Sequence, residues 1–288
     1  MSSASSAVTD PLRRAKAEGW SLVALPQIPE PRGNLTVLEE RVHPPFPIGS
    51  VRWFYDVPAG TSWRAGESRL GDALIVALSG SFEVVLGRRR TRSAIRLSRA
   101  NTGLQVPAGL DWTVHDASTN SVGLVISSQG GRLPSAGPDP LDKTEPSALN
   151  PESTIDDCRT ITLPHRRDEH GSATEAVPRE GVPFDIPRVY YLYDVPGGAR
   201  RGGHAHRELE QIVLAVAGAF DLLLDDGRSV RSIRLDRAHS GVLIATGIWR
   251  ELLSFSSGAI CLVLASAPYD EADYVRNYDA FRREKLGL

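Results

Sequence analysis

Residues 200–210 carry the run Arg-Arg-Gly-Gly-His-Ala-His-Arg-Glu-Leu-Glu. Side chains alternate between the two faces of a β-strand, so His204 and His206 point the same way if this stretch is extended. Gly198 stands upstream of His204, and three residues separate His206 from Glu210. Two imidazoles and a carboxylate in this pattern form a candidate site for a divalent transition metal.

The spacing resembles the first sequence motif of the cupins, whose motif residues lie inside the mouth of a small β-barrel. The second motif of that family would place another histidine where this chain has Arg250. A guanidinium is always charged and has no lone pair, so it would repel a metal ion. We therefore expect a metal-free histidine site. Two alternatives stay open, namely a metal-dependent oxygenase on His204, His206 and Glu210, and histidines that only fill a polar interior.

The chain is a tandem duplication in which residues 32–128 match residues 170–266 at a constant offset of 138. Each half contains short runs rich in Val, Ile and Leu, separated by glycines and turn residues, which favours a β-sandwich or barrel. Helical periodicity is confined to residues 11–18 and 271–285. The sequence thus predicts an all-β protein with two tandem cupin (jelly-roll β-barrel) domains and short terminal helices.

Proline and glycine punctuate the segment between the halves, as in a linker. We expect the first cupin domain at residues 1–130, the linker at 131–158 and the second cupin domain at 159–288.

The composition is that of an ordinary folded protein, with 41% hydrophobic residues among 288. A net charge of -2 and a pI of about 6.4 argue against nucleic acid or an anionic membrane as a partner. Apolar runs are too short to span a membrane. With two cysteines and no secretory signal at the N-terminus, we expect a cytoplasmic protein.

The two halves differ where chemistry is expected. At the offset of 138, Gly66 and Ser68 stand in the first half where the second half has His204 and His206. Likewise, Trp112 stands where the second half has Arg250. We expect a degenerate site in the first domain and the active site in the second.

The second half resembles the cupin sugar 3,4-ketoisomerases that act on dTDP-4-keto-6-deoxyglucose, the WxcM-like proteins. The resemblance covers nearly all of residues 170–283, and the first half resembles the family more weakly through Arg32–Leu35. It implies an isomerase that needs no metal and no redox cofactor, with a dTDP-linked keto-deoxysugar as substrate. The matching segments are Arg188-Val189-Tyr190-Tyr191, Gly203-His204-Ala205-His206, Leu209-Glu210-Gln211, Leu224-Asp225-Asp226-Gly227, Phe255-Ser256-Ser257 and Tyr269-Asp270-Glu271-Ala272-Asp273-Tyr274.

The resemblance also implies residue roles, with His204 as catalytic base and Tyr190 assisting. Moving a carbonyl from C4 to C3 requires a base that removes the C3 proton, an enediolate, and a proton returned to C4. Histidine suits this because its ordinary pKa is about 6.5. The enediolate needs donors or positive charge, which His206 and Arg201 or Arg250 could supply, and Arg201 could instead hold the diphosphate. Further substrate contacts are expected from Arg32, Glu210, Trp249 and His170.

Members of this family are usually dimers that exchange N-terminal strands. This implies that the two halves pack as a pseudo-dimer within one chain, with Arg32 of the first half completing the site of His204. Two other functions remain open. A related epimerase acting at C3 or C5 would also remove a proton beside a ketone, and a non-catalytic bicupin would bind the nucleotide sugar without turnover.

Overall fold

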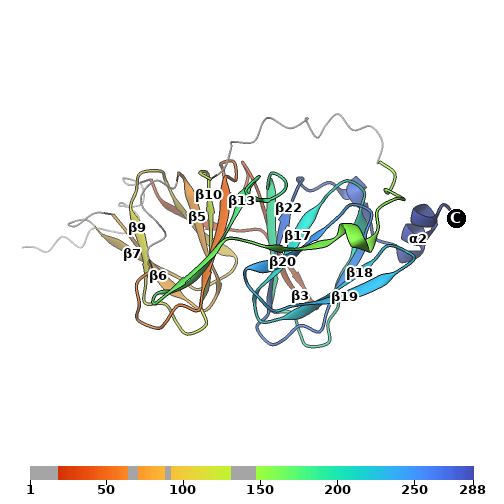
Figure 1. Ribbon diagram of the computed structural model, residues 1–288. Coiled ribbons are helices and arrows are strands. Elements are labelled where there is room, and N and C mark those ends of the chain that lie inside the picture. Colours follow the sequence, from red (N-terminus) through yellow and green to blue (C-terminus); the bar gives the residue numbers. More distant parts are fainter. Residues whose placement is uncertain (1–18, 64–70, 88–91, 131–146) are drawn as a thin grey trace, which may run out of the picture.

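The computed structural model describes residues 19–63, 71–87, 92–130 and 147–288. Two β-rich halves lie side by side (Figure 1), and a single α-helix occurs in these residues, so the all-β prediction is confirmed. No helix in the described residues is long and apolar enough to cross a membrane. The helix predicted at residues 11–18, the positions Gly66 and Ser68, and most of the predicted linker lie outside the described residues.

In the first half, a large sheet faces a small one. The large sheet has the order β1-β8-β5-β10-β4 and the small sheet the order β7-β6-β9. The strands are β1 Ser21–Ala24, β4 Ser50–Tyr55, β5 Ala73–Ser79, β6 Phe82–Leu86, β7 Ser93–Leu97, β8 Thr102–Val106, β9 Trp112–His115 and β10 Val122–Ser127.

The second half repeats this plan after a short 3-10 helix, η2 Ile155–Asp157. Its large sheet has the order β11-β20-β17-β22-β15, and its small sheet the order β19-β18-β21-β16-β23. The strands are β11 Arg159–Thr162, β15 Arg188–Tyr193, β16 Arg201–His206, β17 Gln211–Ala217, β18 Phe220–Asp225, β19 Val230–Leu235, β20 Ser240–Ile244, β21 Trp249–Leu253, β22 Ile260–Ala265 and β23 Tyr274–Val275.

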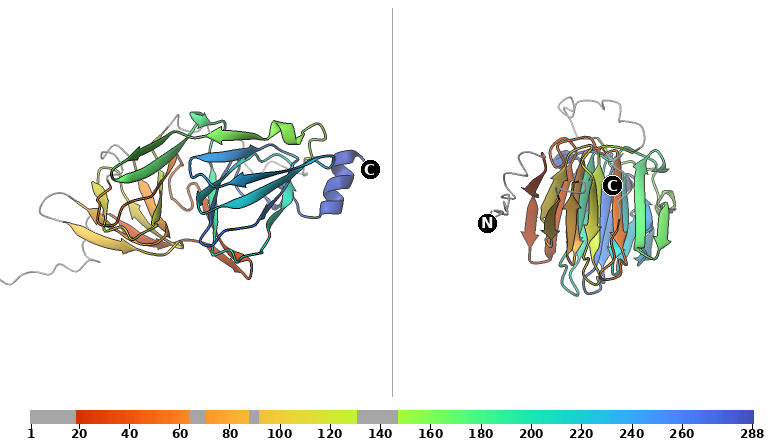
Figure 2. Two further views of the ribbon diagram at one scale, coloured as in Figure 1. Left: turned by 60° about the horizontal axis from the view of Figure 1, so that its bottom comes forward. Right: turned by 90° about the vertical axis from the view of Figure 1, so that its left-hand side faces the viewer.

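Each half contributes one hairpin to the large sheet of the other. The hairpin β2 Gln27–Glu30 and β3 Gly33–Glu39 pairs with β15, which puts Val37 opposite Tyr190. The hairpin β12 His165–Asp168 and β13 Gly171–Pro178 pairs with β4, and the short strand β14 Gly181–Val182 pairs with β13. In the left view of Figure 2, a green hairpin lies on the first half and a red hairpin on the second. Residues near 30 therefore lie at the second barrel, and residues near 170 at the first.

The turn of each exchanged hairpin requires glycine. Gly33 has a φ of 109° and Gly171 a φ of 124°, in the region that L side chains rarely adopt. A Cβ on Gly33 would lie 2.9 Å from the Cα of Val195. The missing side chain lets the tip of the first hairpin lie against the second barrel, which carries the adjacent Arg32 to its mouth.

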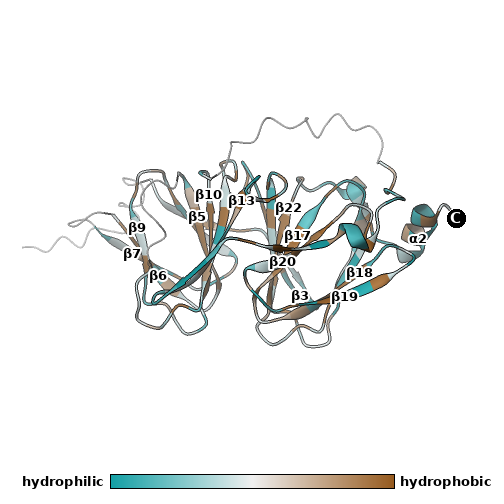
Figure 3. Ribbon diagram, in the orientation of Figure 1, coloured by the Kyte–Doolittle hydropathy of each residue, from teal (hydrophilic) through white to brown (hydrophobic). Residues whose placement is uncertain are grey.

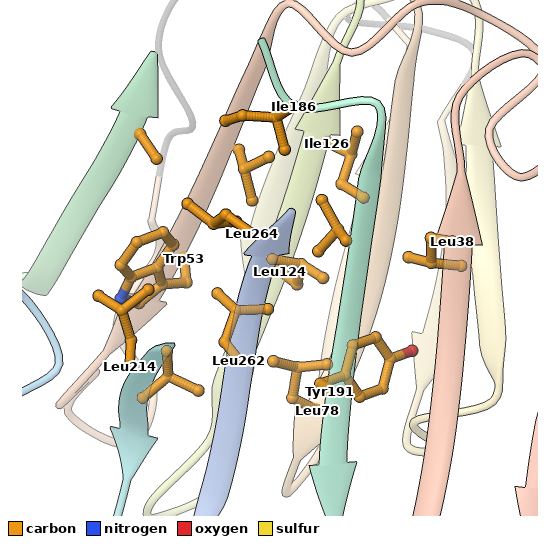
Figure 4. Packing of buried hydrophobic residues seen from close by; sticks show 14 of the residues in the cluster. Leu38, Trp53, Leu78, Leu124, Ile126, Ile186, Tyr191, Leu214, Leu262 and Leu264 are labelled. Carbon is orange, nitrogen blue, oxygen red and sulfur yellow. The ribbon is translucent and has the colours of Figure 1, made fainter. Parts of the chain in front are cut away.

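The largest hydrophobic cluster lies between the two large sheets and draws on both halves. The indole N–H of Trp53 donates to the carbonyl of Ala238 at 2.8 Å, and the hydroxyl of Tyr191 donates to the carbonyl of Ala100 at 2.5 Å. Both groups therefore find their partner in the opposite half, as buried polar groups must. In Figure 3, the brown of hydrophobic residues is found mainly on the strands of the sheets. Figure 4 labels Leu38, Trp53, Leu78, Leu124, Ile126, Ile186, Tyr191, Leu214, Leu262 and Leu264 in the cluster.

The C-terminal helix is shorter than predicted. The helix expected at residues 271–285 is a 3-10 turn, η3 Glu271–Asp273, then the strand β23, and only then the helix α2 Tyr278–Leu286. Asn277 caps α2 by accepting a hydrogen bond from the backbone N–H of Ala280 at 2.8 Å. Strand β23 pairs with β16 and puts Tyr274 opposite His206. The prediction was wrong for residues 271–277 because pairing with β16 outweighs the helical spacing of the aromatic residues.

Candidate active site

A cavity of about 680 Å³ opens in the second barrel, and both halves line it. The walls come from the second half's two sheets and from the exchanged hairpin β2–β3. Its size fits a small-molecule ligand. The polar lining residues are Glu30, Arg32, Glu39 and His43 from the first half, and Arg188, Tyr190, Arg201, His204, Gln211, Arg250, Tyr269, Tyr274 and Arg276 from the second.

His204 and Arg250 face each other across the paired strands β16 and β21. The guanidinium donates from Nη1 to the His204 carbonyl oxygen at 2.7 Å and from Nη2 to the ring nitrogen Nε2. Since arginine can only donate, Nε2 must carry a lone pair, which places the ring proton on Nδ1. Burial, then Arg250, hold the pKa of His204 well below its ordinary value. The imidazole is therefore neutral at physiological pH.

Gln211 links Arg250 to Tyr190 on the floor of the cavity. Its amide oxygen accepts from Arg250 Nε at 2.7 Å and from Nη2 at 2.9 Å, while its amide nitrogen donates to the Tyr190 hydroxyl oxygen at 2.8 Å. Burial raises the pKa of Tyr190 to about 12 and lowers that of Arg250 to about 10. A neutral phenol, a neutral imidazole and a guanidinium cation thus meet at one place.

His206 lies beside the cavity and is held by the 3-10 turn η3, which precedes β23. Its Nδ1 hydrogen-bonds a carboxylate oxygen of Asp273 at 2.6 Å, and its ring packs edge-on against His204 and Tyr274 at centroid distances of 5.0 and 4.3 Å. Its Nε2 is buried without a partner among the described residues. Burial, then Arg250, lower the pKa of His206 well below its ordinary value.

Arg201 and Arg32 meet at the carboxylate of Glu30. Arg201 is buried and donates from Nη1 to Glu30 at 2.6 Å, whereas Arg32 is largely exposed and donates to the same oxygen at 3.2 Å. The structure thus brings the predicted residue Arg32 of the first half to the cavity that contains His204 and Tyr190.

Three predicted substrate contacts do not line the cavity. Trp249 alternates with Arg250 along β21 and packs instead against Tyr278 and Phe281. Glu210 lies in the turn between β16 and β17. His170 is exposed in the hairpin that pairs with the first half, away from the second barrel.

Several lining residues were not predicted from sequence. Gln211 lies in the cavity although the motif spacing pointed to Glu210, because residues 207–210 form a turn that interrupts strand alternation. Arg188 shares a face of β15 with Tyr190, so alternation alone could have identified it. No local signal marks Glu30, whose position depends on the strand exchange.

A metal ion does not fit the proposed ligands in this geometry. The described residues contain no group of three His, Cys, Asp or Glu side chains that could hold one. Arg250 donates to Nε2 of His204 and brings a positive charge to the place a metal ion would take, and Glu210 does not line the cavity. A metal-dependent oxygenase therefore has no ligand set among these residues.

Among the described residues, aromatic side chains occupy the interior of the barrel of the first half. Phe54 stacks on Trp63 at 4.5 Å between ring centroids and meets Phe82 edge-on at 5.1 Å. Gly123 makes room for this cluster, because a Cβ there would lie 2.0 Å from the Phe54 ring. At the offset of 138, Arg52, Ala73 and Trp112 stand in place of Tyr190, Gln211 and Arg250.

Comparison with known proteins gives one consistent result. The family model described as FdtA, WxcM-like, C-terminal, matches residues 18–130 and again 156–286. A TDP-4-oxo-6-deoxy-alpha-D-glucose-3,4-oxoisomerase of Aneurinibacillus thermoaerophilus is 40% identical over 116 residues, which are 40% of this chain and 84% of that protein.

Solved structures of single-unit proteins align with about half of the chain. A 3,4-ketoisomerase from Helicobacter canadensis is 40% identical, with a TM-score of 0.44 over 45% of this chain and 98% of its own. A sugar 3,4-ketoisomerase from Thermoanaerobacterium thermosaccharolyticum, solved in complex with TDP, is 34% identical, with a TM-score of 0.46 over 46% of this chain and 98% of its own.

Proposed function

The chain belongs to the FdtA family of WxcM-like, C-terminal domains, and we propose that it is a TDP-sugar 3,4-ketoisomerase with one working site, in its second half. The substrate is dTDP-4-keto-6-deoxyglucose, whose carbonyl moves from C4 to C3. The relative that is 40% identical is named for the corresponding activity. The observation that carries the proposal is the meeting of neutral His204, neutral Tyr190 and cationic Arg250 in one cavity.

His204 is the base in this reaction. Its neutral imidazole has a lone pair on Nε2, which accepts a hydrogen bond from Arg250. The bound sugar takes the place of that contact, and Nε2 removes the proton from C3. The imidazolium that forms then delivers a proton to C4, and exchange of its proton with solvent in between allows deuterium to enter at C4.

Charge develops on the oxygens of the enediolate while the proton is on His204. Tyr190 passes its proton to the oxygen at C4, which ends as a hydroxyl. The phenolate then takes up the proton that the C3 hydroxyl loses as its oxygen becomes the carbonyl, so the net transfer is one proton from the C3 oxygen to the C4 oxygen. Arg250 supplies positive charge in a cavity of low dielectric constant, where such charge stabilises an anion strongly. No electron leaves the sugar, so the reaction balances without a redox partner.

His206 positions His204. Its bond to Asp273 and its edge-on packing against the His204 ring restrict how that ring can turn. We assign His206 to this positioning because it does not line the cavity.

The two halves act as a dimer within one chain. The hairpin exchange and the presence of Glu30 and Arg32 in the cavity wall support this interpretation. Arg32 and Arg201 present guanidinium groups at the cavity and would bind the diphosphate of the nucleotide, since arginine matches phosphate oxygens in charge and geometry. The filled barrel of the first half supports a structural rather than catalytic role for that half.

The test is incubation with dTDP-4-keto-6-deoxyglucose in deuterated water, followed by proton NMR of the sugar, with His204→Asn as the control. Ketoisomerisation moves the carbonyl to C3 and places deuterium at C4 as exchange proceeds, and the variant shows neither. Exchange with the carbonyl still at C4 would indicate an epimerase. Binding without exchange would indicate a non-catalytic protein.

A further inference from the structure

We propose that Gln211 is a positioning residue that turns the hydroxyl proton of Tyr190 into the cavity, by donating its own amide hydrogen to the phenol oxygen. The proposal rests on the function above and adds a residue to its machinery. It follows from the hydrogen bonds around one buried amide.

The orientation of the Gln211 amide is decided by Arg250. Guanidinium nitrogens only donate, and two of them, Nε and Nη2, lie 2.7 and 2.9 Å from one end of the amide. The opposite orientation would set the amide NH₂ group against these donors. The carbonyl oxygen of Gln211 must therefore face Arg250, and the NH₂ group must face Tyr190.

The amide orientation in turn decides what Tyr190 can do. Its oxygen accepts from Gln211 at 2.8 Å, so its own proton must point elsewhere. Arg250 also hydrogen-bonds this hydroxyl and, like the Gln211 amide nitrogen, can only donate, so neither partner takes up the phenol proton. Tyr190 also lines the cavity. The free O–H is thus available to a ligand oxygen, which suits a donor to the developing enediolate.

The strand framework makes Gln211 a rigid support. The residue begins β17, pairs with Ile244 on one side and Ala265 on the other, and is only 2% exposed. Its two contacts are functional groups of the proposed site. The amide therefore joins the phenol to the guanidinium in a fixed arrangement, with an acceptor at one end and a donor at the other.

Gln211→Glu is the informative substitution. A carboxylate keeps the acceptor for Arg250 but cannot donate to Tyr190, so the phenol turns its proton onto Glu and away from the sugar. We expect kcat to fall about 10²-fold, as in Tyr190→Phe, with KM changed less than about twofold. The double variant Tyr190→Phe with Gln211→Glu should lose no more than either alone. Unchanged kcat, or losses that multiply, would overturn the proposal.

Two control variants separate positioning from structure. Gln211→Met removes both contacts, so it should also release Arg250, raise KM and lower the melting temperature, whereas Gln211→Glu should melt close to wild type. Tyr191→Phe removes the hydroxyl on the opposite face of β15, which bonds Ala100, and should leave kcat unchanged.

A second measurement does not depend on turnover. In protein labelled with ¹⁵N-glutamine, the side-chain NH₂ resonance of Gln211, assigned by its loss in Gln211→Met, should show nuclear Overhauser contacts to the ring protons of Tyr190 beside its hydroxyl. Contacts to the Nε proton of Arg250 instead would overturn the amide orientation. If the wild type converts no keto-sugar, the proposed function fails, and this spectrum still decides the position of the amide.

Discussion

Arg201 and Glu30 form an ion pair of 2.6 Å although 171 residues separate them in the chain. The arginine belongs to the second half and is buried, and the carboxylate comes from the exchanged hairpin of the first half. Glu30 also binds Arg32, so one carboxylate arranges two cations at the cavity. The wall of the site is consequently a joint product of both halves.

Replacement of Arg32 should impair the second-half site although the residue belongs to the first half. We expect Arg32→Ala to reduce kcat/KM about 10- to 100-fold, because a charge-assisted hydrogen bond contributes about 1.5–3 kcal/mol. Steady-state kinetics on the keto-sugar measure this loss. Turnover equal to wild type would show that the hairpin does not contact the substrate.

His170 provides the matched control for Arg32. It occupies the equivalent place in the second exchanged hairpin but lies at the filled barrel of the first half. His170→Ala should therefore keep kcat/KM within about twofold of wild type, since exposed side chains away from a site contribute little. A loss as large as that of Arg32→Ala would mean that the first barrel also takes part in catalysis.

The chain should bind one nucleotide, not two. Phe54, Trp63 and Phe82 occupy the interior of the first barrel, whereas the second barrel contains the cavity. Isothermal titration calorimetry with TDP should give one molecule bound per chain, and Arg201→Ala should weaken that binding. Two binding events per chain would contradict the assignment of the first half as structural.

Activity should persist in mildly acidic solution. The base must be neutral, and the pKa of His204 is lowered by burial and by Arg250, so protonation that inactivates it requires a pH well below 6.5. We expect kcat/KM to stay level from pH 8 to 6 and to fall only at lower pH. In Arg250→Gln, the acid limb should move to higher pH because one source of the shift is gone. An acid limb at 6.5 or above in the wild type would contradict this prediction.

The two halves should unfold together. Trp53 of the first half is buried in the central cluster and bonds Ala238 of the second. Trp53→Phe should lower the free energy of unfolding by about 1–3 kcal/mol, because the buried carbonyl loses its donor. Urea denaturation followed by circular dichroism should give one transition, shifted as a whole. Two transitions, of which only one moves, would show that the halves are independent.

Part of the site could be predicted from sequence because its signals are local. His204 and Tyr190 belong to short strand segments whose alternation and resemblance place them in the barrel. The same reasoning gave a wrong prediction for Glu210 as a substrate contact. Side-chain alternation does not continue through the turn between β16 and β17, and Gln211 lines the cavity instead. The prediction that Trp249 contacts the substrate was wrong for a related reason. Neighbouring residues on a strand face opposite ways, and Arg250 already faces the cavity.

The sequence by itself determined that the protein is all-β, that it is duplicated, and that the histidine pair belongs to the second half, because hydrophobic periodicity and residue identity are properties of the local chain. Only the tertiary structure decided that Glu30 joins the predicted residue Arg32 in the cavity wall, that Asp273 holds His206, and that Gln211 joins Arg250 to Tyr190. These contacts depend on the exchange of hairpins and on which donors and acceptors face each other once the sheets have packed.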